Sequence, residues 1–164
     1  MKKNKKIKVI YSTYTFFKIS NMIEGIFDDA NAMITTQIFN QIKHSNTKIA
    51  MYSVHSTMKY LNDYCKAGKL RDYSVRVGTR KCISHENIKA LLEKLFDKEP
   101  KTLKQIMAWH VKFEKIHPFG DGNGRIGRFL MLMQAEKNNI ALPEVFFTLD
   151  NFETNRQKYY ALFK

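Results

Sequence analysis

The chain has 164 residues, of which 44% are hydrophobic, and this is enough for one domain with its own core. No apolar run approaches the ~20 residues that cross a bilayer, so we expect no membrane association. The 28 basic residues exceed the 15 acidic ones, giving a net charge of +13. Because 22 of the basic residues are Lys and only 6 are Arg, the residue type that makes most specific base and phosphate contacts is scarce. The charge alone therefore does not predict a nucleic-acid-binding protein.

The N-terminal segment is the most basic part of the chain. Residues 1–19 carry six Lys and no acidic residue. The segment resembles the start of a signal peptide, but Lys8 and Lys18 interrupt it and no small-residue cleavage site follows. We therefore expect 1–19 to be an exposed basic tail and 20–164 to be the domain. The two cysteines, Cys65 and Cys82, fit reduced thiols and a cytoplasmic protein, while export into another cell stays open.

Helical periodicity covers most of the remaining sequence. Asp, Thr and Ser mark the starts of several predicted helices, and Pro100 marks one end. The spacing of the apolar residues predicts helices after Asp28-Asp29, from Thr47, from Ser84 to Pro100, over 102–116, after the glycine-rich segment to about 138, and after Asp150. Asp150 and Glu153 have the spacing of a capping box.

One stretch does not follow the helical pattern. Between Arg71 and Gly78 the apolar residues alternate, and Gly78-Thr79 is suited to a tight turn. This predicts a short β-hairpin within a flap at about 70–83. The expected fold is therefore all-α, a single helical domain with one short β-hairpin.

The segment 117–128, HPFGDGNGRIGR, joins two strongly helical regions. Glycines at 122 and 124 permit backbone angles closed to other residues, and free amides at a helix start can hold an anion. Arg125 and Arg128 are three residues apart and lie on the same first turn. Two fixed positive charges beside such amides predict a site for a polyphosphate.

Other side chains in the same segment suit chemistry at phosphorus. Asp121 offers the hard oxygen ligand that Mg²⁺ prefers, and His117 has a pKa suited to a general base. We expect Phe119 to be an apolar anchor that holds the loop to the core. Asn123 fits either a left-handed turn residue or an amide that orients the loop or touches a phosphate.

The segment resembles the signature of the Fic domain family, HxFx[D/E]GNGRxxR, at every specified position. The resemblance covers roughly residues 50–160, including Ala108-x-His110-x-x-Phe113 before the motif and Gly68-x-x-Arg71 before the hairpin. Fic proteins typically transfer AMP from ATP to a Tyr, Thr or Ser hydroxyl of a target protein.

The resemblance implies a role for each matching residue. His117 would be the catalytic base, Asp121 would bind Mg²⁺, and Arg125 and Arg128 would hold the β- and γ-phosphates of ATP. Backbone and side-chain donors of the anion hole would come from three neighbours: Gly122, Asn123 and Gly124. The flap would dock the target by strand-like pairing through four residues: Val75, Arg76, Val77 and Gly78.

Several alternatives stay open at this level. The unmodified Gly122–Arg125 sequence favours AMP over the γ-phosphoryl transfer of Doc-type relatives, but other family members move UMP or phosphocholine, or remove AMP. A non-catalytic nucleotide-binding module is a further reading. A nucleic-acid site is also conceivable at the basic residues around the hairpin, which are Lys69, Arg71, Arg76, Arg80 and Lys81. Self-association, self-modification, the target and the activator are not defined by the sequence.

Ser20 to Gly25 matches a second family pattern, the inhibitory motif [S/T]xxxE[G/N]. Ser20 and Glu24 are four residues apart and share one face of a helix. In the family this Glu pairs with the second Arg of the signature, which is Arg128 here. The resemblance therefore implies an enzyme that is inhibited by its own segment 20–25.

Overall fold

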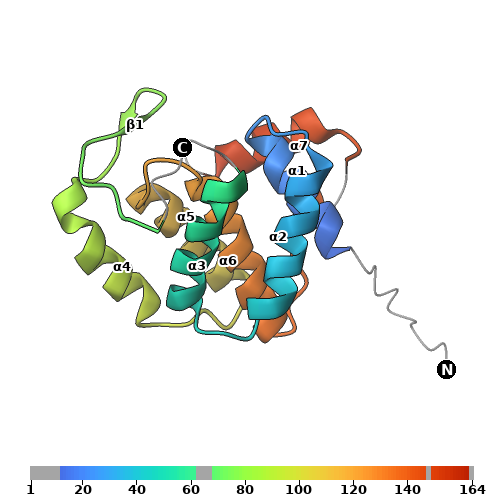
Figure 1. Cartoon of the computed structure of the whole chain (residues 1–164), viewed down its shortest axis with the longest axis horizontal. Helices are drawn as coiled ribbons and strands as arrows, with labels where there is room; N and C mark the ends of the chain where they lie inside the picture. The colour runs from blue at the N-terminus through green and yellow to red at the C-terminus, as the bar shows by residue number, and fades with distance from the viewer. Residues whose placement is uncertain (1–11, 62–67, 147–148, 163–164) are drawn as a thin grey trace.

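A computed structural model describes residues 12–61, 68–146 and 149–162. Figure 1 shows the helices, which are α1 (Thr13–Ile23), α2 (Asp29–Ile42), α3 (Thr47–Leu61), α4 (Ile88–Phe96), α5 (Leu103–Ile116), α6 (Asn123–Lys137) and α7 (Phe152–Ala161). A two-stranded antiparallel sheet pairs β1 (Arg76–Val77) with β2 (Arg80–Lys81). Short 3₁₀ turns lie at His85–Asn87 and Glu144–Phe146. The predicted all-α fold with a short hairpin is confirmed.

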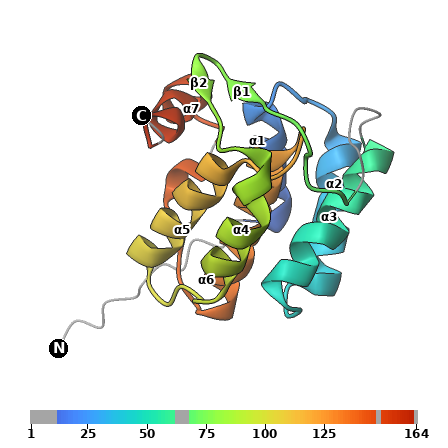
Figure 2. The same cartoon turned by 90° about the vertical axis from the view of Figure 1, so that its left-hand side faces the viewer.

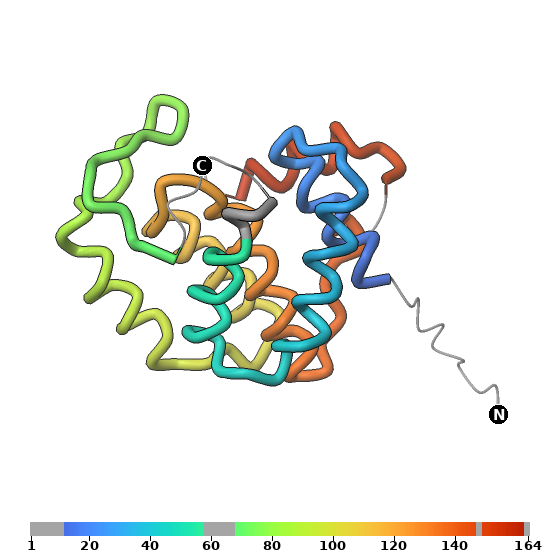
Figure 3. The backbone as a smooth tube through the Cα atoms, in the orientation of Figure 1, coloured from blue at the N-terminus to red at the C-terminus, as the bar shows by residue number. Residues whose placement is uncertain are grey.

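Helix α6 forms the centre of the domain. It contacts α5, α3 and α1, and its residues from Arg125 to Ala135 are buried. A helix buried all round needs an apolar or paired side chain at every position, and here the central run is Phe129 to Met133. Figure 2 shows α4 and α5 on one side of the domain and α2 and α3 on the other, and Figure 3 shows α1 and α2 packed side by side. The core thus holds α6 from both sides.

The predicted boundary of the N-terminal tail at residue 19 is wrong. Residues from Thr13 onward form α1. Ser12 caps the start of this helix, because its hydroxyl accepts a hydrogen bond from the Thr15 amide. Phe16 and Phe17 are buried, and the Phe17 ring stacks on Phe129 of α6 at 5.4 Å. The alternating Ser, Thr and Tyr residues around these rings concealed the helical period. Residues 1–11 of the predicted tail lie outside the described residues.

The flap hairpin is shorter than the alternating sequence pattern. Arg76 pairs with Lys81 and Val77 with Arg80, and the turn is Gly78-Thr79, with Gly78 at φ 57°. Cys82 follows β2 and is buried. Cys65 lies outside the described residues.

Helix starts agree with the sequence where a side chain caps them. Asp28 accepts a bond from the Ala30 amide at 2.9 Å, and Thr102 accepts one from the Gln105 amide at 3.3 Å. Helix α6 begins at Asn123, which agrees with the expected first turn at Arg125 and Arg128. One start differs: the predicted capping box at Asp150 does not form because Asn151, at φ 56°, starts α7 without a side-chain cap.

Within the described parts of the chain, no helix is both long and apolar enough to span a membrane.

Candidate active site

The loop between α5 and α6 reverses the chain with two left-handed residues. His117 ends α5 at φ 52°, and Gly122 precedes α6 at φ 77°. Gly122 adopts this conformation without cost because it has no Cβ. His117 bears a side chain, so its position must be held by its surroundings.

Asn123 holds the inside of this loop. Its Oδ1 accepts from the Phe119 amide at 2.8 Å, and its Nδ2 donates to the Phe119 carbonyl at 2.9 Å. Phe119 is fully buried, and its ring stacks on the imidazole of His55 at 3.8 Å. Asn123 is therefore a helical residue that orients the loop, and its reading as a left-handed turn residue is wrong.

Arg71 ties the base of the flap to the same loop. Its side chain is buried and donates to four backbone carbonyls, those of His117 at 2.8 Å, Tyr73 at 2.8 Å, Ile83 at 2.6 Å and Ile116 at 3.4 Å. Its own amide donates to the Pro118 carbonyl at 2.9 Å. Because the buried Arg71 guanidinium bonds to backbone carbonyls of the loop and the flap, it is not available to contact nucleic acid as part of the basic cluster.

His117 is half-buried beneath the flap. Burial is the main cause that lowers its pKa, the charges of Arg71 and Arg80 lower it further, and a hydrogen bond from the ring to the Glu114 carbonyl opposes them. A lowered pKa favours the neutral form of the imidazole. With one ring nitrogen donating to the Glu114 carbonyl, the other can accept a proton.

Gly120 and the flap approach each other closely. A Cβ on Gly120 would collide with the hydroxyl of Tyr73, which lies at the start of the flap. Tyr73 itself is 43% exposed. The flap and the loop between α5 and α6 thus approach closely at Gly120, and a side chain at this position would have to displace the Tyr73 ring.

Asp121 and Arg125 lie at the start of α6. Asp121 Oδ1 accepts from the Gly122 amide at 2.7 Å, and its Oδ2 lies 3.5 Å from Arg125 Nη2. The Asp121 side chain is 50% exposed, whereas that of Arg125 is 7% exposed. Together they place a buried guanidinium and an accessible carboxylate beside the first amides of a helix.

The Asp121 carboxylate fits Mg²⁺ only together with ligands that the protein does not supply. In the described ranges, no group of three or more His, Cys, Asp or Glu side chains could hold a metal ion. Mg²⁺ is commonly bound by one or two carboxylates together with substrate phosphates and water. A half-exposed Asp121 beside an anion-binding helix start fits that mode.

Arg128 is almost fully buried and is bound from two distant segments. Its Nε donates to Ser20 Oγ at 2.9 Å, and its Nη2 donates to the Ser20 carbonyl at 2.9 Å and to Glu24 Oε1 at 2.7 Å. Its Nη1 donates to the Tyr159 hydroxyl at 2.9 Å. Helices α1 and α7 therefore meet on this one guanidinium.

Gly124 explains how Glu24 reaches this position. Residue 124 is helical, so its glycine is not needed for an unusual backbone angle, contrary to the prediction. A Cβ there would collide with Glu24 Oε1 and press on Arg128 Nη1. The absence of a side chain lets the Glu24 carboxylate lie over the first turn of α6, where the sequence predicted the anion site.

Comparison with known proteins decides the family. A family model described as Fic/DOC family matches residues 34–135, which is more than half of the chain. The chain belongs to the Fic/DOC family. Its fold is also similar to a crystal structure of a Fic family protein from Desulfovibrio desulfuricans G20, with a TM-score of 0.63 and 18% sequence identity. That similarity covers 92% of this chain and 55% of the other, so this chain spans about half the length of that structure.

The flap of this Fic domain presents the predicted docking residues at the surface. Arg76, Val77 and Gly78 are exposed and Val75 is half-buried. Figure 2 shows the hairpin above the end of α5 that leads into the catalytic loop. The charge of Arg80 on β2 also lowers the pKa of His117, after the larger effects of burial and Arg71.

Three residues of this Fic domain were not identified as site residues from the sequence. Tyr159 bonds Arg128, and its hydroxyl also lies 3.1 Å from His110 Nε2. Burial raises the pKa of Glu114 to about 7, and its Oε1 is buried with no hydrogen-bond partner among the described residues. A Cβ on Gly127 would collide with that oxygen. No spacing rule relates Tyr159 to Arg128, whereas Glu114 follows His110 by four residues, a spacing that places both on one face of α5.

Proposed function

We propose that this protein transfers AMP from ATP to a hydroxyl group of a target protein, on Tyr, Thr or Ser. One observation carries the proposal: a neutral imidazole, an anion-binding helix start and two buried arginines lie within one loop and the first turns of α6. This set can take a proton and stabilise negative charge on phosphorus without a covalent enzyme intermediate.

The chemical step follows from these groups. The target hydroxyl oxygen forms a bond to the α-phosphorus of ATP, and the bond from that phosphorus to the oxygen bridging to the β-phosphorus breaks. The hydroxyl proton goes to the free ring nitrogen of His117, and pyrophosphate leaves. Arg125 and the amides after Gly122 stabilise charge on the phosphate oxygens. Mg²⁺, held through Asp121, would neutralise charge between the phosphates.

We also propose that Glu24 inhibits the enzyme from within the chain. Glu24 contacts Arg128 at 2.7 Å and covers Gly124, so a carboxylate lies where the terminal phosphate of ATP would need a cation. Two anions cannot share one buried guanidinium without repulsion. Because 35% of the Glu24 side chain is exposed, its carboxylate can move into water when α1 shifts.

The first experiment measures which group is transferred. Wild type, Glu24→Gly, His117→Ala and the double variant are incubated with Mg²⁺, ATP and cell lysate, with α- and γ-labelled ATP in parallel. We expect a mass gain of one AMP that is strongest in Glu24→Gly and absent from both His117→Ala proteins. Glu153→Gly, which removes an exposed glutamate that pairs with Arg156 at 3.2 Å, is the matched control.

Each other result changes a specific part of the proposal. Equal transfer by wild type and Glu24→Gly would contradict inhibition but leave the chemistry intact. Label from γ-phosphate alone would indicate phosphoryl transfer. ATP binding without transfer in any variant would indicate a nucleotide-binding module.

A further inference from the structure

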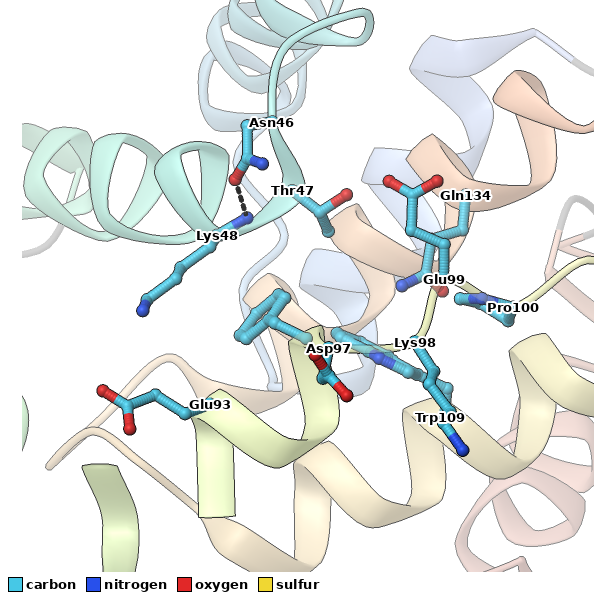
Figure 4. Close-up of a pocket in the computed structure, with 11 residues that line it drawn as sticks. Asn46, Thr47, Lys48, Glu93, Asp97, Lys98, Glu99, Pro100, Trp109 and Gln134 are labelled. Carbon is cyan, nitrogen blue, oxygen red and sulfur yellow. Dashed lines mark hydrogen bonds between the residues drawn. The ribbon is translucent and has the colours of Figure 1, made fainter. Parts of the chain in front are cut away.

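A second cavity lies at the opposite end of the α5–α6 hairpin from the catalytic loop. It has a volume of about 230 Å³ and is bounded by the start of α3, the end of α4, and side chains from α5 and α6 (Figure 4). Gln134, which lines it, follows Asn123 by eleven residues, or about 16 Å along the helix axis. The proposed reaction does not use this cavity.

The innermost polar group of the cavity is the amide of Gln134. The residue is only 4% exposed, and its Oε1 has no hydrogen-bond partner among the described residues. A buried acceptor without a donor is unfavourable, and nearly all such groups in proteins are paired. The cavity therefore offers an acceptor that requires an N–H or O–H donor.

The cavity wall is aromatic. Trp109 is 5% exposed and packs edge-on against Phe96 at 5.4 Å. The indole Nε1 already donates to the Leu95 carbonyl at 3.0 Å, so the tryptophan needs no further polar partner. Aromatic faces of this kind bind apolar stems and attract cations.

The rim of the cavity is acidic although the chain is basic. Glu93, Asp97 and Glu99 line it, against two lysines, Lys48 and Lys98. Figure 4 shows the two lysine side chains extending in different directions, with Asp97 between them. Carboxylates outnumber ammonium groups among the lining residues on a protein of net charge +13, and because Glu99 pairs with Lys101 at 3.4 Å, Glu93 and Asp97 carry the local negative charge. The local charge favours a cationic ligand.

We propose that this cavity binds an ammonium or guanidinium group carried on a short apolar stem. An N–H of the cation donates to Gln134 Oε1, the stem packs on Trp109 and Phe96, and the positive charge lies near the rim carboxylates. Two sources share this chemistry: a free alkylamine, or a Lys or Arg side chain of a protein segment.

The single tryptophan of the chain gives a direct signal, because Trp109 lines the cavity. Trp109 fluorescence and its indole N–H resonance are followed while 1,4-diaminobutane, or acetylated and amidated Gly-Lys-Gly or Gly-Arg-Gly, is added at low salt. We expect saturable shifts with these cations, weakened by salt, and none with butanol or butyrate. The tighter of the two ligand kinds identifies the source. Shifts with butyrate instead, or no saturable shift with any cation, would overturn the proposal.

Variants test the assignment of the groups. Gln134→Met keeps the volume and removes the acceptor, so we expect about tenfold weaker binding, as for a lost hydrogen bond to a charged group. Asp97→Asn, at an exposed position that is safe for folding, weakens binding about two- to fivefold by removing one nearby charge. Gln157→Met on the exposed surface of α7 is the control and leaves binding unchanged. Unchanged affinity in Asp97→Asn and in a folded Gln134→Met would show that the cation does not bind as proposed.

Discussion

Arg125 and Arg128 lie one turn apart on α6, and both are buried, yet they are held in different ways. Arg125 has Asp121 beside it at 3.5 Å, a residue of its own loop. Arg128 is bound by Ser20 and Glu24 of α1 and by Tyr159 of α7. The partner of Arg125 is therefore fixed with the catalytic loop, whereas those of Arg128 can leave with another segment. Under the proposed function, this difference would make Arg125 a constant part of the site and Arg128 the point at which Glu24 controls it.

The largest expected effect tests the constant part. In the Glu24→Gly background, Arg125→Ala should lower AMP transfer about 100-fold, because a buried donor to the transferring phosphates is lost. The transfer rate of Arg125→Lys should lie between those of Arg125→Ala and the Glu24→Gly parent, since Lys keeps the positive charge without the paired N–H donors. Initial rates with labelled ATP measure both. Near-normal transfer in Arg125→Ala would mean that Arg125 only orders the loop.

Arg128 should matter for stability as well as for nucleotide binding. Arg128→Met leaves Ser20 and Tyr159 with buried groups that have lost a partner, and should cost about 2–4 kcal/mol in the free energy of unfolding. The lower part of this range is expected because Glu24 can turn toward water. Urea unfolding measures the loss.

Arg156→Met provides the matched comparison for Arg128→Met. Arg156 also pairs with a glutamate, Glu153, at 3.2 Å, but its side chain is 36% exposed. Its loss should cost less than about 1 kcal/mol. Similar losses for the two arginines would contradict the view that α1 and α7 are joined through Arg128.

Glu114 lies near Arg128 and makes this region sensitive to pH. Burial raises its pKa to about 7 in the folded protein, above the value of 4.5 for a free side chain. Between these two values the folded state holds a proton that the unfolded state has lost, so stability falls as pH rises from 4.5 to 7. Glu114→Gln should remove about 1–3 kcal/mol of this dependence.

The measurement is unfolding free energy at pH 5 and pH 8 for wild type and Glu114→Gln. Relative to wild type, Glu114→Gln should have a higher free energy of unfolding at pH 8 than at pH 5. Glu153→Gln, at an exposed position, should have the same free energy of unfolding as wild type at both pH values. Equal pH slopes in wild type and Glu114→Gln would show that the Glu114 carboxyl ionises normally.

The sequence predicted the elements whose signals are local. Thr102 and Asp28 cap their helices as expected, and Gly78-Thr79 forms the hairpin turn. Segment 117–128 was recognised because its residues act at short spacing, and Asn123 bonds within its own loop. Such contacts join residues that are close in the sequence, so the local sequence pattern predicts them.

The parts that sequence reasoning missed depend on distant contacts. The role of Gly124 could be read only once Glu24, a hundred residues earlier, was placed above it. Helix α1 was taken for a tail because its basic and polar residues masked Phe16 and Phe17, which are buried only against other helices. Tyr159 carries no local sequence signal of a site residue, yet its hydroxyl bonds Arg128. Tertiary packing, and not local propensity, decides each of these cases.

The smallest expected effect concerns α7 and separates its two tyrosines. Tyr159→Phe removes the acceptor for Arg128 Nη1 but keeps the ring that lies 5.2 Å from the guanidinium carbon, so the cost should be about 1–2 kcal/mol. Tyr160→Phe removes a bond to the Ile23 carbonyl at 3.2 Å from a side chain that is more exposed, and should cost about 0.5 kcal/mol or less.

In a double-mutant cycle with Glu24→Gln, Tyr159→Phe should be non-additive because both residues bond Arg128. Tyr160→Phe should be closer to additive. Additive energies for Tyr159 and Glu24 would mean that α1 and α7 act on Arg128 independently, and that only α1 needs to move to free it.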